Sequence, residues 1–195
     1  MLLRNISSWL FKISNGWVAL TGLTIFVLFS VLILPAQSSQ ADEISGETGS
    51  PDMSFFYSSQ NLFDMAEAYG EQGRTDYIRA RFTFDLVWPL VYGFFLSSSI
   101  SWLIKRAELS EKPLGLLNLV PVLGVLFDYS ENITTSWVMF RYPQHAMLPA
   151  ILAPFLTATK WIFVGGSFVI LIFVIFIFIW KTIRSRKRSP NQIIG

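Results

Sequence analysis

The chain lacks cysteine altogether and has a single histidine, His145. The lack of cysteine excludes disulfide bonds, thiolate metal sites, iron–sulfur clusters and cysteine catalysis, and one histidine cannot form a histidine metal site. Charged residues are also scarce, at 14% of the 195 residues, whereas hydrophobic residues reach 52%. The mean hydropathy is +0.49, and a soluble domain of this length would be less apolar. We therefore expect an integral membrane protein that needs no cofactor and no metal.

The apolar residues gather in blocks rather than at a regular spacing. A transmembrane helix needs about 20 predominantly apolar residues, and four blocks approach or exceed this length. The predicted spans are roughly 17–34, 82–104, 114–140 and 151–180. Short links between the later spans predict an antiparallel bundle of four transmembrane helices. The expected fold is therefore all-α and polytopic, with residues 1–195 forming a single membrane domain.

Basic residues predict the direction of these spans. On one side of the membrane lie ten of them: Arg4, Lys12, Lys105, Arg106, Lys112, Lys181, Arg184, Arg186, Lys187 and Arg188. The other side has four arginines, accompanied by eight acids from Asp42 to Asp76. Because cytoplasmic loops are enriched in lysine and arginine, both termini are expected in the cytoplasm and the loop 35–81 outside. The basic tail 181–195 is expected to lie beside anionic lipid headgroups rather than to bind nucleic acid.

Residues 1–41 leave a second interpretation open. A basic start, an apolar core of about 17 residues and the ending Ser39-Gln40-Ala41 are also typical of a cleaved signal peptide. The apolar core is longer than in most signal peptides, so we expect this segment to be retained as the first span. The direction of the other three spans is the same in either case.

The predicted outward loop has two parts. Residues 36–51 are rich in Ser, Gly, Asp and Glu, a composition typical of a flexible linker. Residues 54–70 instead predict an amphipathic helix that ends at Gly70. Its apolar face would consist of Phe55, Leu62, Ala66 and Tyr69. Such a helix would lie over the outer mouth of the bundle, either as a lid over a site or through ordinary packing.

Ionisable residues occur inside the predicted spans, where charges are costly. The third span has a stripe of small and polar residues opposite an apolar face: Pro121, Gly124, Asp128, Glu131, Asn132 and Thr135. Asp85 in the second span, Glu131 in the third and Lys160 in the fourth fall at similar heights, given the 1.5 Å rise of a helix, and Asp128 lies deeper. Tyr92 shares one stripe of the second span with Asp85. We expect a buried polar cluster in the outer half of the bundle, made of Asp85, Tyr92, Asp128, Glu131, Asn132 and Lys160. Its rim is expected to carry Arg74, Arg81 and Arg141.

The predicted cluster holds three acids but only one base, Lys160. Charged groups persist inside a membrane when they are paired, protonated or hydrated. We therefore expect that a rim arginine folds inward, that a carboxyl group is protonated, or that a cation or water fills the space.

Small residues predict where the helices pack closely. The stretch SSSIS at 97–101 in the second span and Gly165-Gly166 in the fourth have side chains small enough for a neighbouring backbone to approach.

Several functions fit this pattern. The preferred one is non-enzymatic: binding of a lipid or small molecule, or service as an accessory subunit with a membrane-protein partner or a second copy of the chain. An alternative is an enzyme that acts on a lipid-like substrate through Asp128 and Glu131. A second alternative is a proton- or cation-coupled carrier, which would need an oligomer because four spans are few. The structural interpretation is an ionic network in which Lys160 and an arginine tie three helices together. The sequence has no nucleophile beside a base, no phosphate-binding glycine loop and no metal-ligand spacing.

Four segments carry a resemblance to a known group of proteins: AYGEQGRTDYIRARFTFDLVWPLVYG, LNLVPVLGVLFDYSEN, RYP and LTATKW. They resemble a family of small four-helix bacterial membrane proteins without an assigned function. The resemblance covers about residues 60–165. It implies a location in the bacterial inner membrane and implies no activity.

Overall fold

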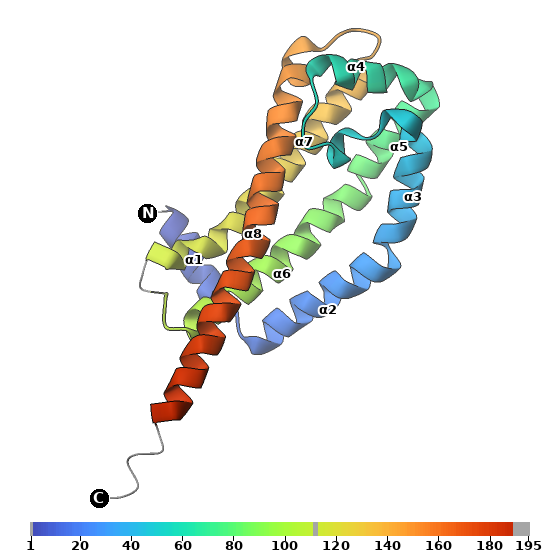
Figure 1. The fold of residues 1–195 in the computed structure, drawn as a ribbon. Helices are drawn as coiled ribbons and strands as arrows, with labels where there is room; N and C mark the ends of the chain where they lie inside the picture. The colour runs from blue at the N-terminus through green and yellow to red at the C-terminus, as the bar shows by residue number, and fades with distance from the viewer. Residues whose placement is uncertain (1, 111–112, 189–195) are drawn as a thin grey trace, which may run out of the picture.

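The computed structural model describes residues 2–110 and 113–188, and every regular element in these ranges is helical (Figure 1). The α-helices are α1 Leu2–Ile13, α2 Gly16–Leu32, α3 Leu34–Ser45, α4 Ser59–Ala68, α5 Gly70–Arg81, α6 Phe84–Arg106, α7 Val120–Arg141 and α8 Met147–Arg188. Short 3-10 helices occur at η1 Gly46–Thr48, η2 Pro51–Met53 and η3 Pro113–Leu119. The all-α prediction is confirmed for this part of the chain.

Three stretches are long and apolar enough to cross a membrane: Gly70–Arg106, Leu114–Arg141 and Met147–Arg184. A fourth is available if α1 and α2 count as one broken span, since the two helices meet at 93°. The prediction of helices long and apolar enough to cross a membrane is confirmed, and their number within the described residues is three or four.

The long helices lie side by side, with α7 along α8 and α6 against α2, α7 and α8 (Figure 1). Two buried apolar clusters hold them together. The first lies where α4 covers the ends of α7 and α8: Leu62, Phe63, Met65, Ala66, Tyr69, Tyr77, Val138, Met139, Ala150 and Ala153. The second lies between α6 and α8: Tyr92, Phe95, Leu96, Ile100, Leu103, Ile104, Ala107, Leu109, Leu171 and Val174. The space between these clusters is where the polar residues of the spans lie.

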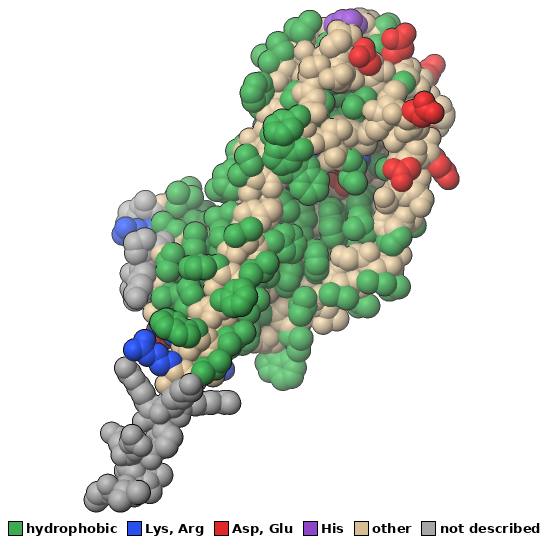
Figure 2. Space-filling view, viewed as in Figure 1, with side chains coloured by type: hydrophobic (Ala, Val, Ile, Leu, Met, Phe, Trp, Pro, Cys, Tyr) green, Lys and Arg blue, Asp and Glu red, His purple; other side chains and the backbone are tan. Residues whose placement is uncertain are grey.

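The two ends of the molecule carry opposite charge. Figure 2 shows the acidic side chains gathered over α3, α4 and α5, whereas basic side chains lie at the far end, near α1 and the C-terminal half of α8. The second end is also tied together by hydrogen bonds. Lys105 Nζ of α6 donates to the carbonyl oxygens of Phe11 and Ser14, at 2.9 and 2.8 Å, and this fixes the sharp corner between α1 and α2.

The predicted flexible linker over residues 36–51 is wrong, because its first part is helical. In α3, Pro35 stands in the first turn, where the missing N–H of proline costs nothing. The helix ends at Gly46, whose φ of 51° lies in the left-handed region that favours glycine. Ile44 and the buried Ser45 hold α3 against the rest of the molecule, so packing overrides the weak helix preference of the serine and aspartate residues in this segment.

The helix α4 falls within the range 54–70 where an amphipathic helix was expected. Ser58 caps it. The Ser58 hydroxyl accepts a hydrogen bond from the backbone N–H of Asn61 at 3.1 Å, and the side-chain oxygen of Asn61 accepts one from the backbone N–H of Ser58 at 2.9 Å. Phe55 lies ahead of this cap and is exposed, so it does not belong to the buried face. Tyr69 stands between α4 and α5, and Gly70, with a φ of 62°, is the first residue of α5.

Candidate functional site

The residues predicted for the polar cluster do lie together. Asp85 and Tyr92 project from α6, Asp128, Glu131 and Asn132 from α7, and Lys160 from α8. Each of the six is less than a tenth exposed. The three residues of α7 occupy one face of the helix because they are spaced three and four positions apart, and this face is turned away from the exposed Leu126 and Ile133.

The centre of the cluster is Asp52, a residue that the sequence analysis did not select. It lies in η2 and accepts a hydrogen bond from Lys160 Nζ at its Oδ1, at 2.9 Å. Its Oδ2 is paired with the Arg81 guanidinium. Trp161 Nε1 also donates to the backbone oxygen of Asp52, at 3.2 Å. No local pattern distinguishes Asp52 from the other acids of the outward loop, so the sequence alone could not single it out.

The carboxyl group of Asp52 is ionised at neutral pH. Burial alone would raise its pKa, but the positive charges of Arg81 and Lys160, together with their hydrogen bonds, hold the pKa well below its ordinary value. The side chain is 22% exposed, so the ion pair stands at the edge of the buried region rather than deep within it.

Glu131 and Lys160 form the innermost ion pair, with 2.5 Å between Glu131 Oε2 and Lys160 Nζ. The other carboxylate oxygen, Oε1, accepts a hydrogen bond from the Thr157 hydroxyl at 2.8 Å. Thr157 is in turn bonded to the Tyr57 hydroxyl at 2.9 Å. Burial raises the pKa of Tyr57 above its ordinary value, so Tyr57 stays neutral. This chain of contacts joins α7 and α8 to the outward loop.

The rim prediction is wrong for Arg81, which is 6% exposed. Its Nη1 lies 2.9 Å from Asp85 Oδ2, and the guanidinium stacks 4.6 Å from the centre of the Tyr77 ring. An inward-turned arginine was one of the expected solutions to the excess of acids. Asp52 and Asp85 both pair with it there, and hydrogen bonds between a guanidinium and carboxylates are among the strongest that side chains form.

The other two rim arginines lie outside the cluster. Arg74 donates to the carbonyl oxygen of Ala66 at 2.8 Å and lies over the Tyr142 ring at 4.8 Å, so it fastens α5 to neighbouring elements. Arg141 is exposed at the end of α7.

Asp128 differs from the other acids because it has no basic partner among the described residues. Its Oδ2 accepts from the Tyr92 hydroxyl at 3.0 Å, and its Oδ1 accepts from the Asn132 amide at 3.1 Å. Both donors are neutral. A carboxyl group that is 7% exposed and has only neutral donors is held at a cost in free energy.

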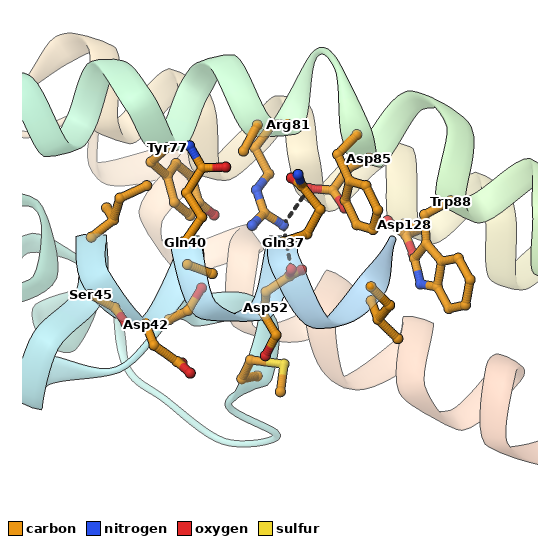
Figure 3. A pocket seen from close by; sticks show the side chains of 18 of the residues that line it. Gln37, Gln40, Asp42, Ser45, Asp52, Tyr77, Arg81, Asp85, Trp88 and Asp128 are labelled. Atoms are coloured by element: carbon orange, nitrogen blue, oxygen red, sulfur yellow. Dashed lines mark hydrogen bonds and ion pairs between the residues drawn. The ribbon is translucent and has the colours of Figure 1, made fainter. Parts of the chain in front are cut away.

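A cavity of about 490 Å³ reaches this cluster from the side of α3 (Figure 3). Its charged end is formed by Asp52, Arg81, Asp85, Asp128 and Lys160. Its apolar wall includes Phe26, Phe84, Trp88, Trp161, Val164 and Phe168. Gln37 and Gln40 of α3 line it as well, so the segment expected to be a linker forms one wall. Figure 2 shows the hollow between α3 and α8, with charged atoms recessed inside it. Glu131 and Asn132 do not line the cavity.

Carboxyl groups outnumber basic groups in the cluster. It holds four carboxyl groups, on Asp52, Asp85, Asp128 and Glu131, and two bases, Arg81 and Lys160. Among residues 2–110 and 113–188, no three His, Asp or Glu side chains are placed to share a metal ion. Chemically, the arrangement offers hydrogen-bond acceptors and negative charge at the end of an apolar cavity.

Comparison with known proteins gives no match: no family model, no curated protein and no solved structure is similar to the chain. The resemblance to small four-helix bacterial membrane proteins therefore stays a prediction. The function is inferred from the geometry of the cavity, since fold alone does not specify function.

Proposed function

We propose that this chain is a non-enzymatic integral membrane protein that binds a lipid or another amphipathic small molecule in the cavity between α3, α6 and α8. One observation carries the proposal: a cavity of about 490 Å³ joins an apolar aromatic wall to a charged end. Ligand sites of proteins have volumes of about 300–1,000 Å³, mostly apolar walls and a few placed polar groups. An amphipathic molecule has the matching division into an apolar body and a polar head.

The proposed membrane arrangement is an antiparallel bundle of four spans in a bacterial inner membrane, with α2 as the helix that crosses first. In this arrangement α1 lies along the cytoplasmic interface, because it exposes Leu2, Leu3, Ile6, Trp9 and Ile13 and meets α2 at 93°. Both termini are cytoplasmic, and α3, α4 and α5 lie at the outer side. The gap between α3 and α8 would then open to the outer half of the bilayer, from which a lipid-like ligand can enter sideways.

The geometry favours binding over acid–base catalysis by Asp128 and Glu131. A catalytic pair must face the same substrate, yet only Asp128 lines the cavity. Both oxygens of Glu131 are already engaged, by Lys160 and Thr157. Glu131 thus serves as a tie between α7 and α8, and Asp128 as part of a binding surface.

The test is photolabelling in liposomes with phosphatidylcholine that carries a photoreactive diazirine in its acyl chain. Mass spectrometry of the digested protein should locate adducts on the cavity wall at Phe26 and Phe168, which line the cavity and are not exposed on the outer surface. Ala41→Trp should reduce these adducts at least several-fold, because Ala41 lines the cavity and a tryptophan there fills it. Ala36→Trp is the matched control, since Ala36 belongs to the same helix but is exposed and does not line the cavity.

Labelling of the lipid-facing surface supplies an internal reference. Phe176 of α8 is 68% exposed, so it should be labelled equally in the wild type and in both variants. Adducts confined to such exposed positions, or equal cavity labelling in both tryptophan variants, would contradict the proposal. In that case, isolation of a stable complex with another membrane protein would support the accessory-subunit interpretation.

A further inference from the structure

We infer that the cavity selects amphiphiles whose head group is an organic ammonium ion, with Asp128 as its counter-charge. The inference rests on the proposed function and adds the chemical class of the ligand. It stands on the pairing of both bases at the end of the cavity, on the position of Asp128, which has no basic partner among the described residues, and on the aromatic rings beside it.

The two bases that line the cavity are not free to bind an anion. Arg81 is paired with Asp52 and Asp85, and Lys160 with Asp52 and Glu131. A carboxylate or phosphate head group that carries no cation of its own would have to displace one of these acids. The displaced carboxylate would remain in the same low-dielectric region, so the exchange would increase repulsion.

The carboxyl groups of Asp85 and Asp128, in contrast, can accept further hydrogen bonds. Asp128 receives hydrogen bonds only from the neutral Tyr92 and Asn132. Asp85 Oδ2 lies beside Arg81 but accepts no well-directed hydrogen bond within the described part of the chain. An ammonium group supplies up to three donors and one positive charge. A ligand of this kind would place a positive charge among four carboxyl groups that share two bases, and would satisfy acceptors that are buried.

Aromatic rings adjoin this acidic end. Trp88 and Tyr92 are one helical turn apart on α6 and both line the cavity, with their ring centres 6.0 Å apart. Figure 3 shows Trp88 and Asp128 at the same end of the cavity. The faces of such rings attract cations, most strongly in desolvated sites. Phe26, which stacks on Trp88 at 5.6 Å, continues the wall toward the apolar part, where the body of an amphiphile would lie.

A bare inorganic cation fits the same region poorly. In the part of the chain that the structure describes, no three acidic or histidine side chains converge as a metal ion requires. The apolar wall would also be left without a function. An organic cation uses both parts of the cavity, so it is the class that the geometry favours.

The experiment is competition against the photoreactive phosphatidylcholine described above, with three amphiphiles of equal chain length: dodecylammonium, dodecanol and dodecanoate. For the wild type, the concentration of dodecylammonium that halves the labelling of the cavity wall should be at least about tenfold lower than that of dodecanoate. A tenfold difference is about the contribution of one charge-assisted hydrogen bond. Asp128→Asn should reduce that preference to less than about threefold. Dodecanol should compete similarly with both proteins.

Asp42→Asn is the matched control, because Asp42 also lines the cavity but is exposed at its mouth on α3. It removes the same charge without touching the buried end, so it should keep the preference for dodecylammonium. If dodecylammonium and dodecanoate competed equally with the wild type, the inferred ligand class would be wrong. The proposed function would still stand, because it rests on labelling of the cavity wall. A preference that survives Asp128→Asn but not Asp42→Asn would overturn the role of Asp128. Failure to label the wild-type cavity at all would overturn both proposals.

Discussion

Asp52 reaches Arg81 and Lys160 from a 3-10 turn that belongs to neither of their helices. It therefore closes an ionic network across α5, α8 and the outward loop. Without it, two buried cations would keep one carboxylate partner each, Asp85 and Glu131. Removing one member of a buried ion pair lowers the stability of the folded protein by more than the intact pair raises it, because the remaining charge stays desolvated without a partner.

We predict that Asp52→Asn lowers the stability of the purified protein by about 3 kcal/mol, or roughly 6–12 °C in the melting temperature of a chain of this size. Because the pKa of Asp52 is lower in the folded state, its contribution is fully present above the unfolded pKa of about 3.9. It is lost only as the pH falls through the still lower folded value. Thermal melts in detergent should therefore show a constant difference from pH 5 to 9.

The control for this variant is Asp64→Asn. Asp64 is an exposed acid of α4 whose Oδ1 accepts a hydrogen bond from the neutral Gln60 Nε2 at 2.8 Å. Loss of the Asp64 charge should therefore change the melting temperature little. An equal loss of stability in both variants, or a difference for Asp52→Asn that disappears near neutral pH, would contradict the network.

The contrast between Asp128 and Asp52 shows how far single residues can be predicted. Asp128 stands inside an apolar run, so its type and helical position already place it with Glu131 on a buried face. Asp52 stands in a polar segment, where an acid is ordinary. Its importance comes from the path of the loop after α3, which brings η2 beneath Arg81, and loop paths are not encoded in a local pattern. The inward turn of Arg81 follows from the same contact.

At the scale of whole elements, small residues decide how closely the helices approach. A Cβ atom on Gly93 of α6 would lie 2.5 Å from Val125 Cγ2 of α7, and one on Gly22 of α2 would lie 3.1 Å from both the Phe95 backbone and the Ser98 hydroxyl. The stretch SSSIS is buried at all of its serines, in agreement with its predicted packing role. Gly165 and Gly166 differ, since a Cβ there meets nothing within 4 Å. Their predicted role in close packing is wrong because they do not face a neighbouring helix.

We predict opposite effects of alanine at two of these glycines. Gly93→Ala should destabilise the protein by about 1–3 kcal/mol, because Val125 is stiff and has to move. Gly165→Ala should be neutral or stabilising by up to about 1 kcal/mol, since alanine is the better helix former. Melting temperatures in the same detergent measure both. Val125→Ala in the Gly93→Ala background should restore part of the loss, and the absence of any rescue would contradict the steric explanation.

The case of α3 shows why elements were harder to predict outside the predicted spans than within them. Within the spans, long apolar runs impose helices, because backbone groups cannot be left unpaired in lipid. Outside them, composition alone suggested a linker. The helix signals were present, with Pro35 at the start and Gly46 at the end, but the packing of Ile44 that stabilises α3 depends on the tertiary structure.

At the scale of the whole molecule, the separation of charge is what relates the fold to the membrane. Acidic side chains cover α3, α4 and α5, and basic side chains lie at the opposite end (Figure 2). Since basic residues are retained on the cytoplasmic side, this separation supports the proposed cytoplasmic termini, and in that proposed orientation the mouth of the cavity would lie in the outer half of the bilayer. The proposed ligand would then enter from the outer leaflet, because the orientation of the protein decides which leaflet the cavity opens to.

The natural lack of cysteine allows this orientation to be tested with single cysteine variants. Ala68→Cys and Ser8→Cys place a thiol at exposed positions of α4 and α1. In spheroplasts of a bacterial host, a membrane-impermeant maleimide should modify Ala68→Cys at once, and Ser8→Cys only after permeabilisation. The reverse pattern would contradict cytoplasmic termini. Modification of both from outside would mean that α1 and α2 re-enter the membrane instead of crossing it, which would leave three spans.

The same two variants distinguish a retained first span from a cleaved signal peptide. The N-terminal helix is bound to the rest of the protein: Ser7 Oγ donates to the Gly115 carbonyl oxygen at 3.1 Å, and the Asn118 amide donates to the Ser7 carbonyl oxygen at 3.2 Å. These contacts would be lost on cleavage, so we predict that the intact mass of the purified protein includes Ser8. A mature protein that begins near residue 42 would lack both α2 and most of α3. The cavity would then lose the wall formed by Phe26 and Gln37, and the proposed binding site would not exist in the mature protein.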